Sequence, residues 1–244
     1  MATDDVVVAG LGEVGGPLFD LIRQKHAAIG IDVQPTPPLG RCAVLHICYP
    51  FGKTFVDSTF QYIKVHGPAL TIINSTVAPG TTRAVHRLAG TPVVYSPIRG
   101  KHSKMKSDIL HYTKFIGGID HPSAIRAEKH FQTIGLKTKL LGSPEAVELA
   151  KLTETTYFGV LIAWAQEVAR YCGDLQIDYD EVASFYEEIA FLPRVKYTPG
   201  IIGGHCVMPN IEILKQAFTS DLLDAIVSSN ETRIRQADAE SLVL

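Results

Sequence analysis

The chain has 244 residues, of which 46% are hydrophobic and 20% charged, and this composition provides enough apolar material for a sizeable core. The formal net charge of −2 gives no reason to expect nucleic acid or an anionic membrane as a partner. No apolar run approaches the roughly 20 residues that cross a bilayer, and the acidic start leads directly into a predicted strand, so neither a membrane span nor a signal peptide is expected.

Short apolar runs alternate with helical patterns over the first 142 residues, which is typical of a parallel sheet with helices on both faces. A segment with three prolines and a glycine, residues 33–41, stands where most folds of this class have a further helix, so the first half of the fold is expected to be shortened. The predicted helices cover residues 17–25, 54–65 and 81–88. The predicted strands cover residues 6–9, 28–32, 42–48, 69–74, 92–95, 115–117 and 137–141.

The pattern becomes helical after Gly142. Ser143 can cap a helix that has Pro144 at its first position, and this helix is predicted to continue to Cys172. Further helical segments are expected over 180–190, 211–218 and 220–239. We therefore predict two domains, residues 1–142 and residues 143–244. The predicted fold class is α/β: a Rossmann-type doubly wound parallel sheet followed by an all-helical dimerisation and substrate domain.

Residues 10–15 read Gly-Leu-Gly-Glu-Val-Gly and lie between the first predicted strand and the first helix. In this context the first glycine permits a tight turn, the second permits close approach of a pyrophosphate, and the third permits helix–strand packing. The N-terminus of the helix offers unpaired N–H groups to the phosphates. A glycine-rich turn of some other doubly wound protein is the alternative interpretation.

Asp32 follows the second predicted strand, where a carboxylate accepts hydrogen bonds from the adenosine ribose and repels a 2′-phosphate. No arginine follows at positions 33 and 34, so the expected cofactor is NAD and not NADP. The predicted cofactor-binding residues are Gly10, Gly12, Glu13, Val14, Gly15, Asp32, Tyr49, Pro50, Ser75 and Thr76.

Four blocks of the sequence resemble the UDP-glucose/GDP-mannose dehydrogenase family, including its UDP-N-acetylmannosamine branch. They are residues 74–82 (NSTVAPGTT), the Ser96-Pro97 region, residues 151–157 (KLTETTY) and residues 199–209 (PGIIGGHCVMP). The last block resembles the family's catalytic-cysteine loop and is the most specific of the four. The blocks follow the family's order and extend over nearly the whole chain. The resemblance implies an enzyme that oxidises the primary alcohol of a sugar with NAD.

The resemblance also implies roles for individual residues. Cys206 would be the nucleophile that takes up an aldehyde as a thiohemiacetal, and a thiolate is the reactive form for such a step. Lys151 would stabilise the developing oxyanion. Thr76 would help to position substrate or a water molecule.

Three positions differ from the residues that the family carries there. His102 aligns with the family's glutamate, Thr155 with its asparagine and Asn210 with its aspartate. Histidine can still act as a base near neutral pH and threonine can still donate a hydrogen bond, but Asn210 cannot take up a proton. These differences weaken the case for thioester hydrolysis more than the case for a single hydride transfer.

The end of the chain favours a reduced relative of this family. Residues 230–233 resemble the end of the family's central domain, so its C-terminal nucleotide-sugar domain is expected to be absent. We keep three hypotheses. The first is an NAD-dependent dehydrogenase similar to nucleotide-sugar dehydrogenases. The second is a β-hydroxyacid-dehydrogenase-like enzyme that uses Lys151 on a small hydroxy acid, and the third is a non-catalytic NAD-binding sensor or regulatory protein.

Cysteine usage and the long helix bear on location and partners. The four cysteines show no CxxC pairing or zinc-like spacing, so reduced thiols, a cytoplasmic protein and no metal are expected. Cys42, Cys48 and Cys172 are expected to be buried, whereas no core needs the Gly-Gly-His-Cys segment that contains Cys206.

The helix over 144–172 has apolar residues on more than one face, including Trp164, and this pattern predicts a homodimer.

Overall fold

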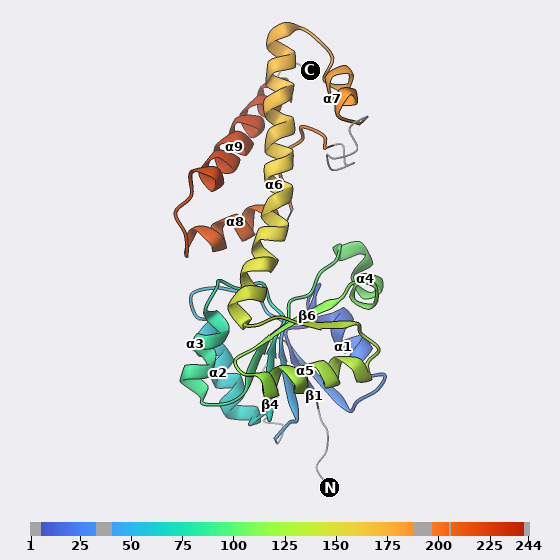
Figure 1. Cartoon of the computed structure of the whole chain (residues 1–244), viewed down its shortest axis with the longest axis vertical. Helices are drawn as coiled ribbons and strands as arrows, with labels where there is room; N and C mark the ends of the chain where they lie inside the picture. The colour runs from blue at the N-terminus through green and yellow to red at the C-terminus, as the bar shows by residue number, and fades with distance from the viewer. Residues whose placement is uncertain (1–5, 33–40, 188–196, 205, 242–244) are drawn as a thin grey trace. The chain divides into compact units, whose positions relative to one another are not determined.

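The computed structural model describes residues 6–32, 41–187, 197–204 and 206–241 (Figure 1). The chain divides into two compact units, residues 1–151 and 152–244, and the division falls inside the long helix α6 (Pro144–Leu175). It therefore lies nine residues beyond the predicted boundary at Gly142. The first turns of α6 belong to the first unit because Val147 is buried in that unit's core and Glu148 binds the start of another of its helices.

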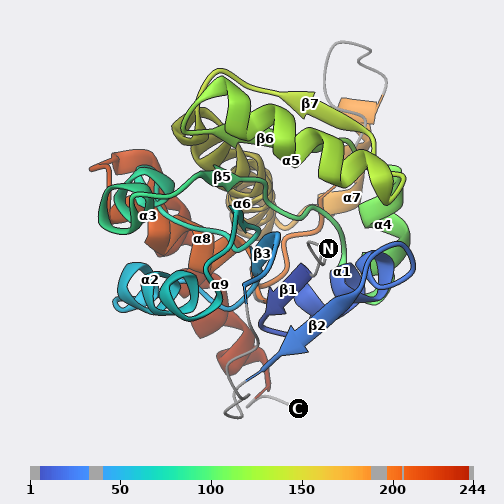
Figure 2. The same cartoon turned by 90° about the horizontal axis from the view of Figure 1, so that it is seen from below.

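The first unit is built on a seven-stranded sheet of order β2-β1-β3-β4-β5-β6-β7 (Figure 2). All seven strands were expected from the sequence, and β1, β2, β3, β4 and β5 pair in parallel. The strands are β1 (Val6–Ala9), β2 (Ala28–Ile31), β3 (Val44–Ile47), β4 (Leu70–Ile73), β5 (Val93–Tyr95), β6 (Lys114–Gly118) and β7 (Thr138–Leu140).

The sheet departs from the predicted parallel arrangement at one pair of strands. β6 runs antiparallel to β5, and β7 then runs parallel to β6. The reason lies in residues 96–113, which leave and re-enter the sheet at the same end instead of crossing over one of its faces. The rest of the architecture agrees with the expected α/β fold.

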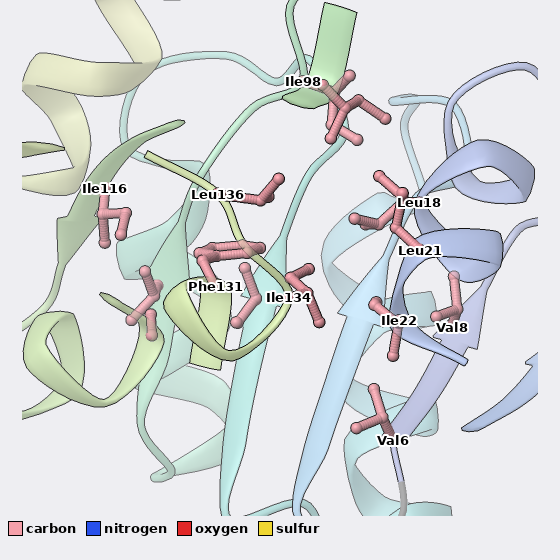
Figure 3. Packing of buried hydrophobic residues seen from close by; sticks show 14 of the residues in the cluster. Val6, Val8, Leu18, Leu21, Ile22, Ile98, Ile116, Phe131, Ile134 and Leu136 are labelled. Carbon is pink, nitrogen blue, oxygen red and sulfur yellow. The ribbon is translucent and has the colours of Figure 1, made fainter. Parts of the chain in front are cut away.

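Helices cover both faces of this sheet. α1 (Gly15–Ile22), α4 (Met105–His111) and α5 (His121–Thr133) contribute to one apolar cluster, and Figure 3 shows Leu18, Leu21 and Phe131 from this cluster. α2 (Phe55–His66) and α3 (Thr81–Ala89) contribute to a second cluster, on the other face.

Two of these helices, α4 and α5, were missed in the sequence. A signal for α5 was present: the Asp120 carboxylate accepts a hydrogen bond from the backbone N–H of Ser123 at 2.7 Å, and a proline stands in the first turn. Both features mark a helix N-terminus.

The second unit comprises the rest of α6 together with α7 (Tyr179–Glu187), α8 (Val207–Lys215) and α9 (Asp221–Ser241). Its core contains Leu152, Ile211 and Ile226. A Cβ at Gly159 of α6 would lie 3.0 Å from a methyl carbon of Val207, so this interior glycine permits close packing of α6 and α8.

The helices predicted for this unit are present, but their first and last residues differ from the predicted ones. α8 begins four residues before the predicted start, because proline is tolerated in the first turn of a helix. The last three residues of the predicted helix over 180–190 lie outside the described residues. The same is true of residues 33–40, which make up nearly all of the proline-containing segment over 33–41. In the described part of the chain, no helix is both long and apolar enough to cross a membrane.

Candidate functional site

The three glycines of the turn after β1 differ in how much space the protein leaves for a side chain. Gly10 has a φ of +91°, and a Cβ there would lie 2.7 Å from the backbone nitrogen of Tyr49. A Cβ at Gly15, the first residue of α1, would lie 1.8 Å from the carbonyl oxygen of Gly10. A Cβ at Gly12 would meet no atom within 4 Å. Gly10 and Gly15 are therefore required by the protein's own packing, whereas the space above Gly12 is open.

A cavity of about 240 Å³ adjoins this turn. It lies at the carboxyl ends of β1, β2 and β3, where the strand order reverses, and such a switch point is where open α/β sheets bind ligands. Four of the predicted cofactor-binding residues line it: Gly10, Asp32, Tyr49 and Pro50. The sequence analysis missed the other lining residues, which come from α2 and the turn before it: Gly52, Thr54, Phe55, Ser58 and Tyr62.

Tyr49 gives the cavity an aromatic wall. Its ring centroid lies 5.1 Å from that of Phe55 and 5.7 Å from that of Tyr62. Its hydroxyl is 2.6 Å from Oγ1 of Thr59, and burial raises the pKa of the phenol, so Tyr49 stays neutral. Flat aromatic side chains of this kind stack on planar ligand rings.

Ser75 and Thr76 follow β4. The hydroxyl of Ser75 donates to the carbonyl oxygen of Tyr49 at 2.6 Å, so Ser75 ties the end of β4 to the end of β3. Thr76 is half-buried at the start of the turn that leads into α3. Among the other predicted cofactor residues, Glu13 is exposed and Val14 packs against the apolar cluster beneath α1.

Glu148 of α6 connects the turn between β4 and α3 to the part of α6 that carries Lys151. Its carboxylate accepts hydrogen bonds from the backbone N–H of Gly80 at 2.6 Å and from that of Thr82 at 2.9 Å. It also accepts one from the Thr82 hydroxyl at 2.6 Å. The side chain is fully buried, and this burial raises the pKa of Glu148. Lys151 follows three residues later, on the same face of the helix.

His102 lies in a short 3₁₀ turn, His102–Lys104, at the start of α4; its side chain falls outside the described part of the structure. The segment that leads to it is well connected. The hydroxyl of Ser96 donates to the carbonyl oxygen of Phe115 at 2.8 Å, and the N–H of Lys101 donates to the Asp108 carboxylate at 2.8 Å.

Cys206, Asn210 and Thr155 belong to the second unit. Cys206 is exposed and stands immediately before α8, and the backbone N–H of Asn210 donates to its carbonyl oxygen at 3.1 Å. The side chain of Asn210 is buried, and Thr155 is half-buried on α6. The contrast with the other cysteines was expected: Cys42 and Cys172 are buried, although Cys48 is only half-buried.

The segment before Cys206 is held by polar side chains that the sequence analysis did not single out. Gln166 of α6 donates to the carbonyl oxygen of Gly200 at 2.8 Å, and Arg233 of α9 donates to that of Pro199 at 3.1 Å. Asn230 of α9 binds both backbone groups of Ile202. The available signal in the sequence was the presence of Gln166 and Asn230 on predicted helix faces that are otherwise apolar, because buried polar side chains need hydrogen-bond partners.

The predicted catalytic residues thus fall into two groups. Thr76, His102 and Lys151 belong to the first unit, as does the cavity, and Thr155, Cys206 and Asn210 belong to the second. Among the residues that the structure describes, no three histidine, cysteine, aspartate or glutamate side chains gather as a metal ion would require.

A glycine-rich turn after the first strand, an acidic residue after the second and a cavity at the switch point are the features of a Rossmann-type fold. Within this class, residues 145–232 match the central domain of the UDP-glucose/GDP-mannose dehydrogenase family. This match includes two of the four sequence blocks, residues 151–157 and 199–209, and agrees with the resemblance that they carry.

Curated relatives come from several archaea and from Escherichia coli. A UDP-N-acetyl-D-mannosamine dehydrogenase of Methanocaldococcus jannaschii is 28% identical over 191 residues, which are 76% of this chain and 44% of that protein. One of Pyrococcus horikoshii is 32% identical over 154 residues, which are 57% of this chain and 35% of that protein. The matched part is therefore less than half the length of these relatives.

Solved structures show the same fold. UDP-D-ManNAc dehydrogenase of Pyrococcus horikoshii matches with a TM-score of 0.83 at 20% identity, over 96% of this chain and 70% of that one. The 3-hydroxyisobutyrate dehydrogenase of Mycobacterium tuberculosis matches with a TM-score of 0.74 at 17% identity. That second match covers 97% of this chain and 94% of the other.

Proposed function

We propose that this chain is an NAD-dependent dehydrogenase of the nucleotide-sugar kind, which oxidises an alcohol by hydride transfer. The observation that carries the proposal is the open space at Gly12, between two glycines that the fold itself requires. A side chain there would cost the protein no contact, so its absence is explained by a ligand that approaches the backbone. The related proteins bear the name of UDP-N-acetyl-D-mannosamine dehydrogenases.

The residues around the cavity suit NAD. The N-terminus of α1 and the space at Gly12 suit a pyrophosphate, and the wall formed by Tyr49 and Tyr62 suits a planar base. Asp32 lines the same cavity and suits the ribose hydroxyls while disfavouring the 2′-phosphate of NADP. NAD supplies the hydride acceptor when bound.

The protein's own groups would do the remaining work. The Lys151 ammonium donates a hydrogen bond to the substrate oxygen as negative charge develops there, and Thr76 orients the substrate. His102 accepts the hydroxyl proton as the carbon loses a hydride, and this first step leaves an aldehyde.

A second oxidation would proceed through Cys206. Its thiolate would add to the aldehyde carbon, and the resulting thiohemiacetal would lose its hydroxyl proton and a hydride to become a thioester, an oxidation that requires a second NAD as acceptor. Water then releases the acid and regenerates the thiol. Thr155 and Asn210 can form hydrogen bonds in these steps. Neither side chain can take up a proton during hydrolysis of the thioester. These residues therefore support a single oxidation, to the aldehyde, better than the complete oxidation to the acid.

A second candidate is oxidation of a small hydroxy acid. It is favoured by the likeness to 3-hydroxyisobutyrate dehydrogenase, which extends over 94% of that chain. In this case Lys151 alone acts as acid and base, and Cys206 takes no part.

Homodimerisation through α6 is part of the proposal. Tyr157, Trp164 and Tyr171 follow one another at seven-residue spacing and are each about half exposed. This spacing places them on one face of the helix, where a second copy of α6 would bury them. A dimer mass in light scattering that falls to the monomer mass in Trp164→Glu would support this proposal; a monomeric wild-type protein would refute it.

The cofactor is tested first by titrating the protein with NADH and following NADH fluorescence. Saturable binding is expected, at least tenfold weaker in Asp32→Ala and weaker for NADPH than for NADH. Turnover is then assayed with UDP-N-acetylmannosamine and with 3-hydroxyisobutyrate. Loss of sugar oxidation in Cys206→Ala supports the covalent path, whereas unchanged turnover shows that Cys206 takes no part. Tight NADH binding without turnover of any alcohol would favour the non-catalytic sensor.

A further inference from the structure

Lys114, the first residue of β6, has a buried side chain whose ammonium group is surrounded by oxygen acceptors. Nζ lies 2.5 Å from the carbonyl oxygen of Ser96 and 2.8 Å from that of Pro97. It lies 3.2 Å from Oδ1 of Asn74. An ammonium group has three N–H donors, so all three are used. The ring of Phe131 lies on a further side, 5.1 Å from Nζ.

The three acceptors belong to two strand ends of the candidate site. Asn74 directly follows β4 and immediately precedes Ser75 and Thr76. Ser96 directly follows β5 and begins the segment that leads through Pro97 to His102. Lys114 therefore connects the backbone of one segment with the side chain that begins the other.

The direction of every hydrogen bond in this network follows from Lys114. Because the ammonium can only donate, Oδ1 of Asn74 must face it, and Nδ2 of Asn74 then donates to Nδ1 of His46 at 3.0 Å. His46 carries its proton on Nε2 and donates to Nε2 of His130 at 2.9 Å. Burial lowers the pKa of both histidines, in agreement with two neutral rings.

We propose that Lys114 is a positioning residue that holds the segments bearing Thr76 and His102 in the arrangement that catalysis requires. Lys114 acts only through those residues and does not itself touch the substrate. The inference rests on the proposed function for the roles of Thr76 and His102. The three hydrogen bonds and the burial of the ammonium stand independently of it.

The protonation of Lys114 gives this role a pH dependence. Burial lowers the pKa of Lys114 to about 7. Loss of the proton leaves an amine with two donors for three acceptors, two of which are carbonyl groups of the segment that begins at Ser96, so one acceptor loses its partner. The segment that begins at Ser96 is therefore held more weakly as the pH rises through about 7. The titratable and charged groups around Lys114 come from several elements: His46 of β3, Cys48 directly after it, His130 of α5 and Lys151 of α6. Arg99, Asp108 and Tyr112 line a small cavity together with Lys114.

The neighbouring groups do not remove this effect. Burial raises the pKa of Cys48 to about 12, so this thiol brings no negative charge near neutral pH. The positive charge of Lys151 acts in the same direction as burial and lowers the pKa of Lys114 further.

Hydrogen exchange of the full chain tests the inference without a substrate. Two amides of the segment, Ser96 and Lys101, donate to Ile73 and Asp108 and report on its order. After correction for intrinsic exchange, protection of residues 96–104 in the wild-type protein is expected to fall at least threefold between pH 6 and pH 8.5. Lys114→Met is expected to lose at least tenfold of the protection at pH 6 and to show no pH dependence. Lys129→Met, exposed on α5, is the matched control and should behave as wild type.

Two outcomes of the exchange measurement would overturn the inference. One is wild-type protection that does not change with pH, a measurement that requires no variant to fold. The other is Lys114→Met with wild-type protection at pH 6. Lys114→Arg keeps its charge at both pH values and should retain protection at pH 8.5, where the wild-type protein loses it.

Activity separates this inference from the proposed function. In an active protein, Lys114→Met should lower kcat at least tenfold and change the Kd for NADH less than twofold, because Lys114 does not line the cofactor cavity. If the wild-type protein binds no NADH and oxidises no alcohol, the proposed function fails, and the exchange measurements still decide whether Lys114 holds the segment. Unchanged kcat in Lys114→Met would show that the segment's position does not matter to the reaction.

Discussion

Asn230 binds the backbone of Ile202 through both ends of its side-chain amide, accepting from the N–H at 2.7 Å and donating to the carbonyl oxygen at 3.2 Å. Both residues are buried, so Asn230 replaces the pairing that a neighbouring strand would otherwise give to this backbone. Two glycines follow Ile202 before Cys206. Among the described residues on either side of the cysteine, Ile202 is held by Asn230 and α8 is held by its packing in the core of the second unit.

Asn230→Ala should destabilise the second unit by about 2–4 kcal/mol, because it leaves a buried N–H and a buried carbonyl oxygen without a partner. Urea unfolding of the two proteins measures the difference. Ser228→Ala, exposed two residues earlier on α9, is the control and should change the unfolding free energy by less than about 0.5 kcal/mol. A loss for Asn230→Ala no larger than that of the control would mean that the backbone finds other partners.

Gly12→Ala and Gly15→Ala should separate cofactor binding from folding. A Cβ at Gly12 meets no atom of the protein, so Gly12→Ala should unfold within about 0.5 kcal/mol of wild type while binding NADH at least tenfold more weakly. A Cβ at Gly15 would lie 1.8 Å from the Gly10 carbonyl oxygen, so Gly15→Ala should lose several kcal/mol of stability. Thermal unfolding and NADH titration of both variants provide the two readouts. Gly12→Ala with wild-type affinity would contradict the proposed path of the pyrophosphate.

The features of the first unit that the sequence predicted are local in the chain. The seven strands are short segments made mostly of apolar residues, and the turn at residues 10–15 lies between a strand and a helix that can each be identified without the other. The cavity could be predicted in part because Asp32 and Tyr49 follow strands directly. Such signals need no knowledge of distant contacts.

The features that were missed depend on contacts between distant parts of the chain. Glu148 binds a helix start 66 residues away, and Lys114 binds an asparagine 40 residues away. In sequence these two residues are an ordinary glutamate on a helix and an ordinary lysine before a strand. The antiparallel orientation of β6 is set by where the chain re-enters the sheet, and an apolar run does not encode its own direction.

Glu148→Ala should destabilise the first unit by about 3 kcal/mol or more. The change leaves the buried N–H of Thr82, the half-buried N–H of Gly80 and the Thr82 hydroxyl without their acceptor at the start of α3. Glu145→Ala, one turn earlier on α6, is a closely matched control. Glu145 pairs with Arg83, but both side chains are substantially exposed, so its removal should cost less than about 1 kcal/mol. Urea unfolding checks the difference, and equal losses for the two variants would contradict the role assigned to Glu148.

The buried histidines predict that the first unit loses stability in acid. Burial lowers the pKa of His130 to about 4 and that of His46 well below its usual value, whereas both histidines titrate near 6.5 in the unfolded chain. Between these values the unfolded chain binds more protons than the folded one, so the free energy of unfolding falls as the pH falls from about 6.5 toward 4. His130 alone contributes about 3 kcal/mol to this loss, from its shift at 1.36 kcal/mol per pH unit.

Unfolding in urea at pH 4.5, 5.5, 6.5 and 7.5 tests this expectation. His130→Gln keeps an oxygen that can accept from Nε2 of His46 but removes the titration, so its stability should depend less steeply on pH than that of the wild-type protein. His121→Gln, exposed at the start of the same helix, removes a histidine without touching the network and should leave the slope unchanged. Equal slopes for wild type and His130→Gln would show that His130 takes up its proton without opening the network.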